Sequence, residues 1–177
     1  ASAVDAAHGN ARAVPMDASA DAVVGADLII NASVVGQSGI RRLPGDRVTC
    51  LEPYSPLAQA EPVVLAASAN DTDAAFYLAW FGGSTSDIAA NQQSAARIVT
   101  GAKPGAAFFD LVYSPLETTF LRQARLSGHP TLNGKSMNII QAVEAFVPRV
   151  MRPHLEIQRW SPDEAYKLVF ESMLAVW

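Results

Sequence analysis

A stretch centred on residues 108–146 constrains the possible folds of this chain most strongly. It begins with an apolar run, residues 106–112, that only Asp110 interrupts and that is typical of a buried strand. A helix follows, because Pro115 suits a first helical turn and Gly128, with a proline two residues later, ends the segment. The face of this helix predicted to be buried consists of Leu116, Phe120, Leu121 and Ala124.

A short extended piece over residues 129–132, an Asn133-Gly134 turn and a second helix to about residue 147 complete the stretch. The predicted buried stripe of this second helix is Ile139, Ile140, Val143, Phe146, Val147 and Val150. Met137, Gln141 and Ala145 fall on the opposite face. Periodicity alone favours a solvated Gln141, since surface glutamines are common.

The N-terminal part repeats the alternation of strand and helix. Residues 1–9 are most easily the end of a helix, and residues 11–15 are a strand candidate. Residues 17–25 predict a helix that Asp17 or Ser19 caps and Gly25 ends. Residues 27–33 predict a second strand. This order predicts an α/β fold, a parallel sheet covered by helices.

The middle of the chain allows more than one interpretation. Residues 36–62 are loop-like, and residues 61–67 predict a strand. A helix from Asn70 or Asp71 is predicted to stop at Gly82-Gly83, before a second helix over residues 87–99. Residues 82–86 could expose amides to a phosphate, but a turn between helices is favoured. Three arginines, Arg41, Arg42 and Arg47, could also meet phosphate, but solvated charges are favoured.

The last helix is predicted to begin at Ser161-Pro162, with Glu164 able to complete a capping box. Its apolar residues cover more than one side, and only Lys167 and Glu171 form a narrow polar edge. Such a helix needs contacts on two sides. A second copy of the chain or a separate domain could supply the second contact.

Composition excludes several classes of protein. The 177 residues are 50% apolar and 17% charged, which indicates one globular domain by default. A net charge of −4 without a basic cluster argues against nucleic acid as a partner. The sequence has neither an apolar run of roughly 20 residues nor a leader-like N-terminus, so no membrane partner and a cytoplasmic location are expected. Cys50 is the only cysteine, and His8, His129 and His154 are scattered, so no metal site is predicted.

Three blocks of this sequence together resemble the C-terminal signature of the shikimate 5-dehydrogenase family. They are GADLIINASVVG at residues 25–36, DLVYSPLETTFLRQA at 110–124 and NGKSMNIIQAVEAF at 133–146, in the family's order. The resemblance implies an α/β, Rossmann-like three-layer domain with a mostly parallel sheet. Residues 1–150 are expected to be a partial NAD(P)-binding domain with an unusual segment at about 40–103, and residues 151–177 a helical extension. By this alignment the chain begins inside the domain, because the family's glycine-rich turn lies upstream and no G-x-G-x-x-G occurs here.

The resemblance also implies a site. The residues that match positions beside the cofactor, NADP or NAD, are Asn31, Ala32, Ser33, Val112, Gly134 and Met137. Tyr113 and Gln141 match residues that reach the substrate, a shikimate-like small molecule, and both are expected to meet at the rim of one sheet. The family's catalytic Lys and Asp belong to an N-terminal substrate domain that no segment here matches. We therefore assign no catalytic residue.

The leading hypothesis is an oxidoreductase that interconverts 3-dehydroshikimate and shikimate in aromatic amino acid biosynthesis, with this chain as part of a longer enzyme. One alternative is a catalytically silent module that associates with itself or a partner through its terminal helix. Another is a relative whose middle segment forms a different small-ligand pocket. Residues 34–105 are much longer than the family's connection between the two matching strands, so either an insertion is present or the sheet order differs.

Overall fold

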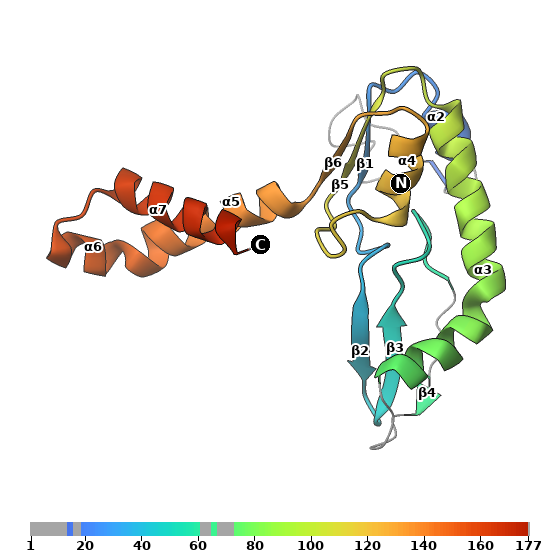
Figure 1. Ribbon diagram of the computed structural model, residues 1–177, viewed down its shortest axis with the longest axis horizontal. Helices are drawn as coiled ribbons and strands as arrows, with labels where there is room; N and C mark the ends of the chain where they lie inside the picture. The colour runs from blue at the N-terminus through green and yellow to red at the C-terminus, as the bar shows by residue number, and fades with distance from the viewer. Residues whose placement is uncertain (1–13, 16–18, 61–64, 67–72, 177) are drawn as a thin grey trace. The chain divides into compact units, whose positions relative to one another are not determined.

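The computed structural model describes residues 14–15, 19–60, 65–66 and 73–176 (Figure 1). It divides into two compact units, residues 1–133 and residues 134–177. The helix end predicted over residues 1–9 and the start of the strand predicted over residues 11–15 lie outside the described residues. Among the helices described, none is both long enough and apolar enough to cross a membrane.

A three-stranded parallel sheet organises the first unit and confirms the predicted α/β fold. Its strands are β1 (Leu28–Asn31), β5 (Ala107–Asp110) and β6 (Thr131–Asn133), in the order β1-β5-β6. Asn31 pairs with Asp110, which in turn pairs with Asn133, so the three strands end at the same edge. β5 lies directly beside β1, so the long middle segment does not place a strand between them. Of the two alternatives, the structure favours an insertion.

Helices cover one face of this sheet. Ile29 and Phe108 point to that face and pack against the helices α3 (Asp73–Gly101) and α4 (Thr119–Leu126). The core there consists of Ile29, Val99, Ala102, Ala106, Phe108, Phe120, Leu121 and Ala124. Alternate strand residues point the other way, and Leu28, Ile30 and Leu132 remain about half exposed among the described residues.

The middle segment contains an antiparallel sheet that the sequence did not predict. Its strands are β2 (Gly39–Leu43), β3 (Arg47–Leu51) and β4 (Leu65–Ala66), in that order. The prediction of a loop over residues 36–62 was therefore wrong for β2 and β3. Gly45 and Asp46 both have positive φ, and they form the turn of a hairpin between these strands. Arg42 and Arg47 are exposed, in keeping with solvated charges.

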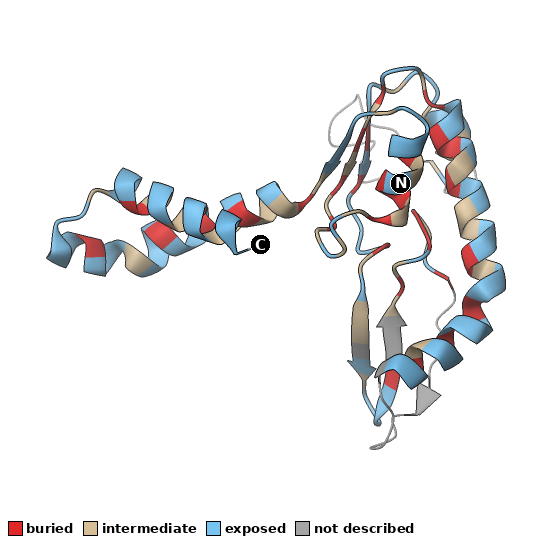
Figure 2. Cartoon of the chain, in the orientation of Figure 1, coloured by how far each residue is buried: buried red, intermediate tan, exposed pale blue. Residues whose placement is uncertain are grey.

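One continuous helix, α3, replaces the two helices predicted for residues 70–99, so the predicted break at Gly82-Gly83 was wrong. Figure 2 shows buried residues at regular intervals along it. These are Phe76, Trp80, Ser84, Ile88, Ala95, Ile98 and Val99, spaced at or near multiples of one helical turn. The stripe passes through the glycine pair without a shift, so burial on one side keeps the helix intact. Both the phosphate interpretation and the helix-to-helix turn are thereby excluded for these residues.

The helix α4 begins later than predicted. Thr118 is its N-cap and its side chain accepts a hydrogen bond from the backbone N–H of Leu121, whereas Pro115 precedes the helix after a cis peptide bond. Leu116 is exposed, so it does not belong to the buried face. Gly128 ends the segment with positive φ, as predicted.

The second unit is helical. It contains α5 (Lys135–Phe146), the π-helix η2 (Val147–Met151), α6 (Arg152–Gln158) and α7 (Pro162–Ala175). Ile139, Val143, Val147, Leu155 and Ala165 form its core. α7 begins where predicted, with Pro162 in its first turn, but the side chain of Ser161 makes no capping hydrogen bond. The predicted capping box is therefore not formed.

Candidate functional site

A cleft lies at the edge of the parallel sheet where β1 and β5 end. Its cavity of about 250 Å³ is lined by the segment after β1 and the segment after β5. The lining residues are Ala32, Ser33, Val34, Gln37, Leu111, Val112 and Tyr113. Carboxyl ends of adjacent parallel strands are where open α/β sheets bind ligands, because the loops that follow diverge there.

Asn31 holds the first of these segments in place. It is the last residue of β1 and is buried, and its amide nitrogen donates to the backbone oxygen of Val35 over 3.0 Å. Its amide oxygen accepts from both the backbone N–H and the hydroxyl of Ser33, over 3.1 and 2.6 Å. The Ser33 hydroxyl in turn accepts from the N–H of Val35 over 3.2 Å. These bonds fold residues 31–35 into a tight turn beside the cavity.

Asp110 joins this turn to the segment after β5. One of its carboxylate oxygens, Oδ1, accepts from the Asn31 amide over 3.0 Å and from the backbone N–H of Val112 over 2.9 Å. The other, Oδ2, accepts from the Thr118 hydroxyl over 2.6 Å. A single buried carboxylate therefore fixes the ends of two strands and the start of α4.

Two backbone features close the same region. The N–H of Ser38 donates to the carbonyl oxygen of Ser114 over 3.2 Å, which links the two segments a second time. Gly36 has a φ of 92° and is buried against Thr118, and a Cβ at this position would lie 3.5 Å from the Thr118 side chain. The positive φ, which residues with a side chain rarely adopt, favours glycine here.

Two side chains that could act as an acid or a base, Asp110 and Lys103, are not placed for catalysis. Burial raises the pKa of Asp110, and hydrogen bonds from Thr118, Val112 and Asn31 oppose that effect. Both of its oxygens already accept hydrogen bonds, so this carboxyl is structural. Lys103 is paired with Asp27, which precedes β1 and thus lies at the opposite edge of the sheet. The described geometry gives no reason to assign a catalytic role to either residue.

The structure brings together five of the residues singled out in the sequence. The cleft is lined by Ala32, Ser33, Val112 and Tyr113. Asn31 does not line it but donates a hydrogen bond to Asp110 beside it. The remaining three belong to the second unit: Gly134 is buried at the start of α5, Met137 is half-buried and Gln141 is exposed. Tyr113 and Gln141 belong to different units, and their expected meeting stays a prediction.

Sequence reasoning missed the importance of Asp110 and Thr118. An acid inside an apolar strand was a visible signal, because a buried carboxylate requires hydrogen-bond donors. The partner of Asp110 could not be identified from sequence, since Thr118 was placed in the first turns of a helix instead of at its cap. Gln37 also lines the cleft, and no pattern in the sequence distinguished it from other loop residues.

Comparisons with known proteins support the resemblance over part of the chain. A shikimate dehydrogenase (NADP(+)) of Methanosarcina mazei is 38% identical over 84 residues, which is 46% of this chain and 30% of that protein. A protein of the same name from Methanosarcina barkeri is 49% identical over 43 residues, 24% of this chain and 15% of its own length. One from Streptococcus pneumoniae strain Hungary19A-6 is 51% identical over 37 residues, 21% of this chain and 13% of its own.

The matched part of the chain therefore spans less than a third of the length of these curated relatives. No family model matches the chain. No solved structure matches it either.

Proposed function

We propose that this chain is part of an NADP-linked oxidoreductase of the shikimate dehydrogenase type, which interconverts 3-dehydroshikimate and shikimate. Relatives over part of the chain carry that name. The observation that supports the proposal most is the cleft, because two of the three family-like sequence blocks converge on it across adjacent parallel strands. A ligand site at this edge is what an open parallel sheet favours.

The cleft suits one end of a dinucleotide. Its volume of about 250 Å³ is below the roughly 300 to 1,000 Å³ of pockets that enclose whole small ligands. Val34, Leu111 and Val112 give it apolar walls for a flat ring, and the side chains of Ser33 and Gln37 offer polar groups for an amide. When bound, NADP would supply the hydride chemistry. The chain's own contribution would be to hold and orient the nicotinamide end.

The remaining assignments follow from the same proposal. Tyr113 would present its hydroxyl to polar groups of the substrate, and Gln141 of the second unit would do the same. Gly134 and Met137 would contact the cofactor from the start of α5. The base that exchanges the proton of the substrate hydroxyl would come from another domain, since neither Asp110 nor Lys103 is placed for that role.

Titration of the purified chain with NADPH and with NADH, with and without shikimate, tests this proposal. Ala32 is exposed at the cleft, so Ala32→Leu should fill the cavity without disturbing the core and weaken NADPH binding by at least about tenfold. Ala89→Leu, at an exposed position of α3, is the matched control and should leave binding unchanged. Equal NADPH affinity in the two variants would place the cofactor elsewhere, and no binding by the parent chain would contradict the proposal.

A second candidate function, a silent module that associates with a second copy of itself, is favoured by one observation. Within the second unit Leu168 and Leu174 of α7 stay about half exposed, while the opposite side of α7 packs on that unit's core. Sedimentation of the chain over a range of concentrations tests this candidate. A dimer that Leu168→Glu dissociates, together with absence of nucleotide binding, would favour it over the oxidoreductase; a monomer at all concentrations would exclude it.

A further inference from the structure

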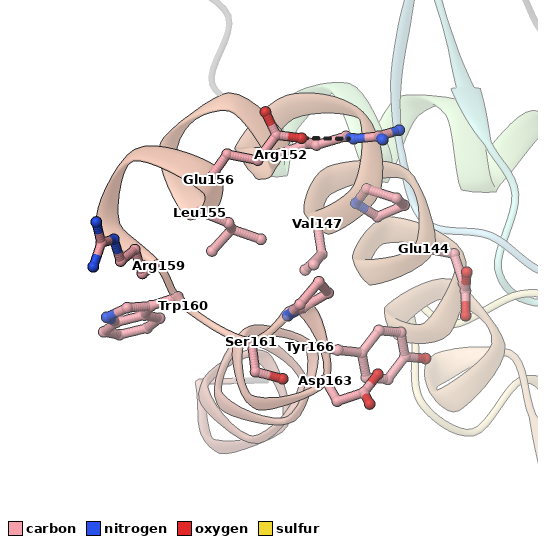
Figure 3. Close-up of a pocket in the computed structure, with 12 residues that line it drawn as sticks. Glu144, Val147, Arg152, Leu155, Glu156, Arg159, Trp160, Ser161, Asp163 and Tyr166 are labelled. Carbon is pink, nitrogen blue, oxygen red and sulfur yellow. Dashed lines mark hydrogen bonds and ion pairs between the residues drawn. The ribbon is translucent and has the colours of Figure 1, made fainter.

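The second unit contains a large cavity of its own. The residues that line it come later in the sequence than those that line the cleft of the first unit. The hollow, of about 720 Å³, lies between η2 and α6 on one side and the start of α7 on the other (Figure 3). All of its lining residues fall between Glu144 and Tyr166. Its volume is in the range of pockets that enclose a complete small molecule.

Two unusual backbone features build this cavity. Val147 and Pro148, which line it, begin the π-helix η2, and π-helical turns occur frequently at functional sites. Arg159 has the left-handed conformation, with φ 55° and ψ 35°, and it turns the chain from α6 towards α7. A non-glycine residue in this conformation costs energy and is retained where the surrounding structure requires it. Here the turn presents Trp160 at the rim, where it is 50% exposed.

The interior of the cavity is apolar and its walls are aromatic. Val147 and Leu155 are buried and form the floor. Figure 3 shows the Trp160 indole on one side and the Tyr166 ring on the other. Tyr166 is fixed by a stacked contact with Phe170, with ring centroids 6.4 Å apart and planes at 8°. A flat or branched apolar group would be enclosed between these surfaces.

The charges around the cavity are unevenly distributed. Arg152 and Glu156 form an ion pair over 3.2 Å, so they largely cancel each other. Figure 3 places Glu144, Tyr166 and Asp163 on one side and Arg159 on the opposite side. No ion pair with a cationic side chain is recorded for Glu144 or Asp163 in the described part of the chain. One side of the cavity therefore carries two carboxylates beside an aromatic ring.

Tyr166 strengthens this asymmetry. Burial and, after it, the charge of the neighbouring Glu144 raise the pKa of Tyr166. The Tyr166 hydroxyl therefore stays protonated, and Glu144 and Asp163 lie on the same side of the cavity as its ring. A negative rim beside the face of an aromatic ring attracts cations and repels anions.

From this arrangement we propose that the cavity of the second unit binds a small organic cation, an amine with an apolar body. The ammonium group lies beside Glu144, Asp163 and the Tyr166 ring. The apolar body lies over Val147 and Leu155 and extends towards Trp160. Arg159, on the far side, disfavours a second positive charge there. This site is separate from the proposed dehydrogenase function and does not depend on it.

Three ligands that share one ring test the proposal. Phenethylamine, 2-phenylethanol and 3-phenylpropanoate are titrated separately into the full chain by isothermal titration calorimetry. Phenethylamine should bind in a saturable manner, about tenfold more tightly than 3-phenylpropanoate, with 2-phenylethanol between them. Equal or tighter binding of the carboxylate, or no saturable binding of the amine, would overturn the proposal.

Variants at the carboxylates locate the site. Asp163→Asn and Glu144→Gln should each weaken phenethylamine binding by about threefold and leave 2-phenylethanol unaffected. Glu164→Gln is the matched control, because it also removes an acid from the first turn of α7 but does not line the cavity. An effect of Glu164→Gln equal to that of Asp163→Asn would mean general charge attraction and would contradict a site.

The aromatic wall is tested by Trp160→Ala. Trp160 is half exposed, so the variant should fold, which circular dichroism checks. Affinity for phenethylamine and 2-phenylethanol should both fall about fivefold, because both place their ring against the indole. Unchanged affinity in a folded variant would show that the amine binds outside this cavity.

Discussion

The two ends of α3 pack against sheets of different kinds. Near its C-terminus, Val99 packs against the parallel sheet, and near its N-terminus, Phe76 and Trp80 pack in the cluster that contains Val48 of the antiparallel sheet. The parallel part carries a buried polar network centred on Asp110, whereas the antiparallel part is held by an apolar cluster. The same helix thus supports two regions of different character.

Strand direction explains the difference. In the parallel sheet, Asn31, Asp110 and Asn133 are all last residues of their strands and lie in register across one edge. Side chains from distant parts of the chain therefore converge there, and the loops that follow enclose a cleft. Neighbouring antiparallel strands end at opposite edges, so β2 and β3 bring only sequence neighbours together. The sequence blocks that resemble dehydrogenases lie in the parallel part and in α5.

Of the substitutions that compare the parallel and antiparallel parts, loss of the Trp80 side chain should lower the free energy of unfolding most. Trp80 is fully buried in the antiparallel half, so Trp80→Ala should lower the free energy of unfolding by about 4 kcal/mol through the cavity it leaves. Hydrogen exchange should show loss of protection in β2 and β3, with β1 and β5 less affected. Equal loss in both sheets would mean that α3 joins them into one cooperative unit.

Trp80→Phe is the control for this variant. The indole Nε1 is buried without a hydrogen-bond partner among the described residues, so a smaller ring removes volume but also removes an unsatisfied donor. We expect a loss of about 1 to 2 kcal/mol, well below that of the alanine variant. A loss as large as that of Trp80→Ala would indicate a partner for the indole N–H outside the described residues.

Removal of the Asp110 carboxyl tests the buried polar network of the parallel part. Asp110→Ala leaves the Asn31 amide, the Val112 N–H and the Thr118 hydroxyl without their acceptor, so unfolding free energy should fall by about 3 kcal/mol. Asp110→Asn keeps one acceptor oxygen and should cost about 1 kcal/mol. Chemical denaturation measures both. A smaller loss for the alanine variant than for the asparagine variant would contradict the role of the carboxyl as an acceptor.

The contribution of Asp110 to stability should depend on pH, and its pKa gives the direction of that dependence. Burial raises the pKa of Asp110 above 3.8, its ordinary value, in the folded protein. Its contribution to stability is therefore fully present below that value and is lost as the pH rises through the folded pKa. The stability of the parent chain minus that of Asp110→Asn should fall as the pH rises from about 3.5. A difference that grows with pH would mean that the network holds the ionised carboxylate more strongly than burial opposes it.

The parallel part was more predictable from the sequence than the antiparallel part. β1 and β5 were predictable because near-continuous apolar runs mark buried parallel strands. The hairpin of β2 and β3 was missed because Pro44-Gly45 was interpreted as part of a loop, although Ile40 and Val48 lie in the strands on either side of this turn. The glycine pair in α3 was misinterpreted because propensity favours a break there, whereas burial along one side overrides it.

For the site, the sequence predicted the elements but not the connections among them. Asn31 and Ser33 were singled out by resemblance, and the structure shows that they bond each other to shape the turn. The acceptor role of Asp110 depends on Thr118, a residue eight positions later that begins a helix. Such a contact depends on where α4 begins, and helix boundaries are the least certain element of a sequence-based prediction.

Two glycines with positive φ, one beside the cleft of the parallel part and one in the hairpin of the antiparallel part, allow a finer comparison of the two regions. Gly36→Ala should cost about 1 to 2 kcal/mol, because its φ of 92° is a conformation that L side chains rarely adopt; the new methyl group itself would make only ordinary van der Waals contact with Thr118. Gly45→Ala in the hairpin turn has a φ of 76° with open space around it, so it should cost about 1 kcal/mol. Only Gly36→Ala should also change NADPH binding, measured by titration. Equal effects on binding would mean that the cleft does not depend on its supporting turn.

The smallest effect expected is a gain at Gly82, in the part of α3 that packs on the antiparallel half. A Cβ there meets nothing within 4 Å, so Gly82→Ala should raise the unfolding free energy by about 1 kcal/mol through helix propensity alone. Gly101→Ala, at the last residue of the helix, is the control and should gain less. If hydrogen exchange shows that β1 and β5 share the gain, α3 transmits stability between the halves. If only β2 and β3 gain, the halves unfold separately and the cleft is stabilised by its own network.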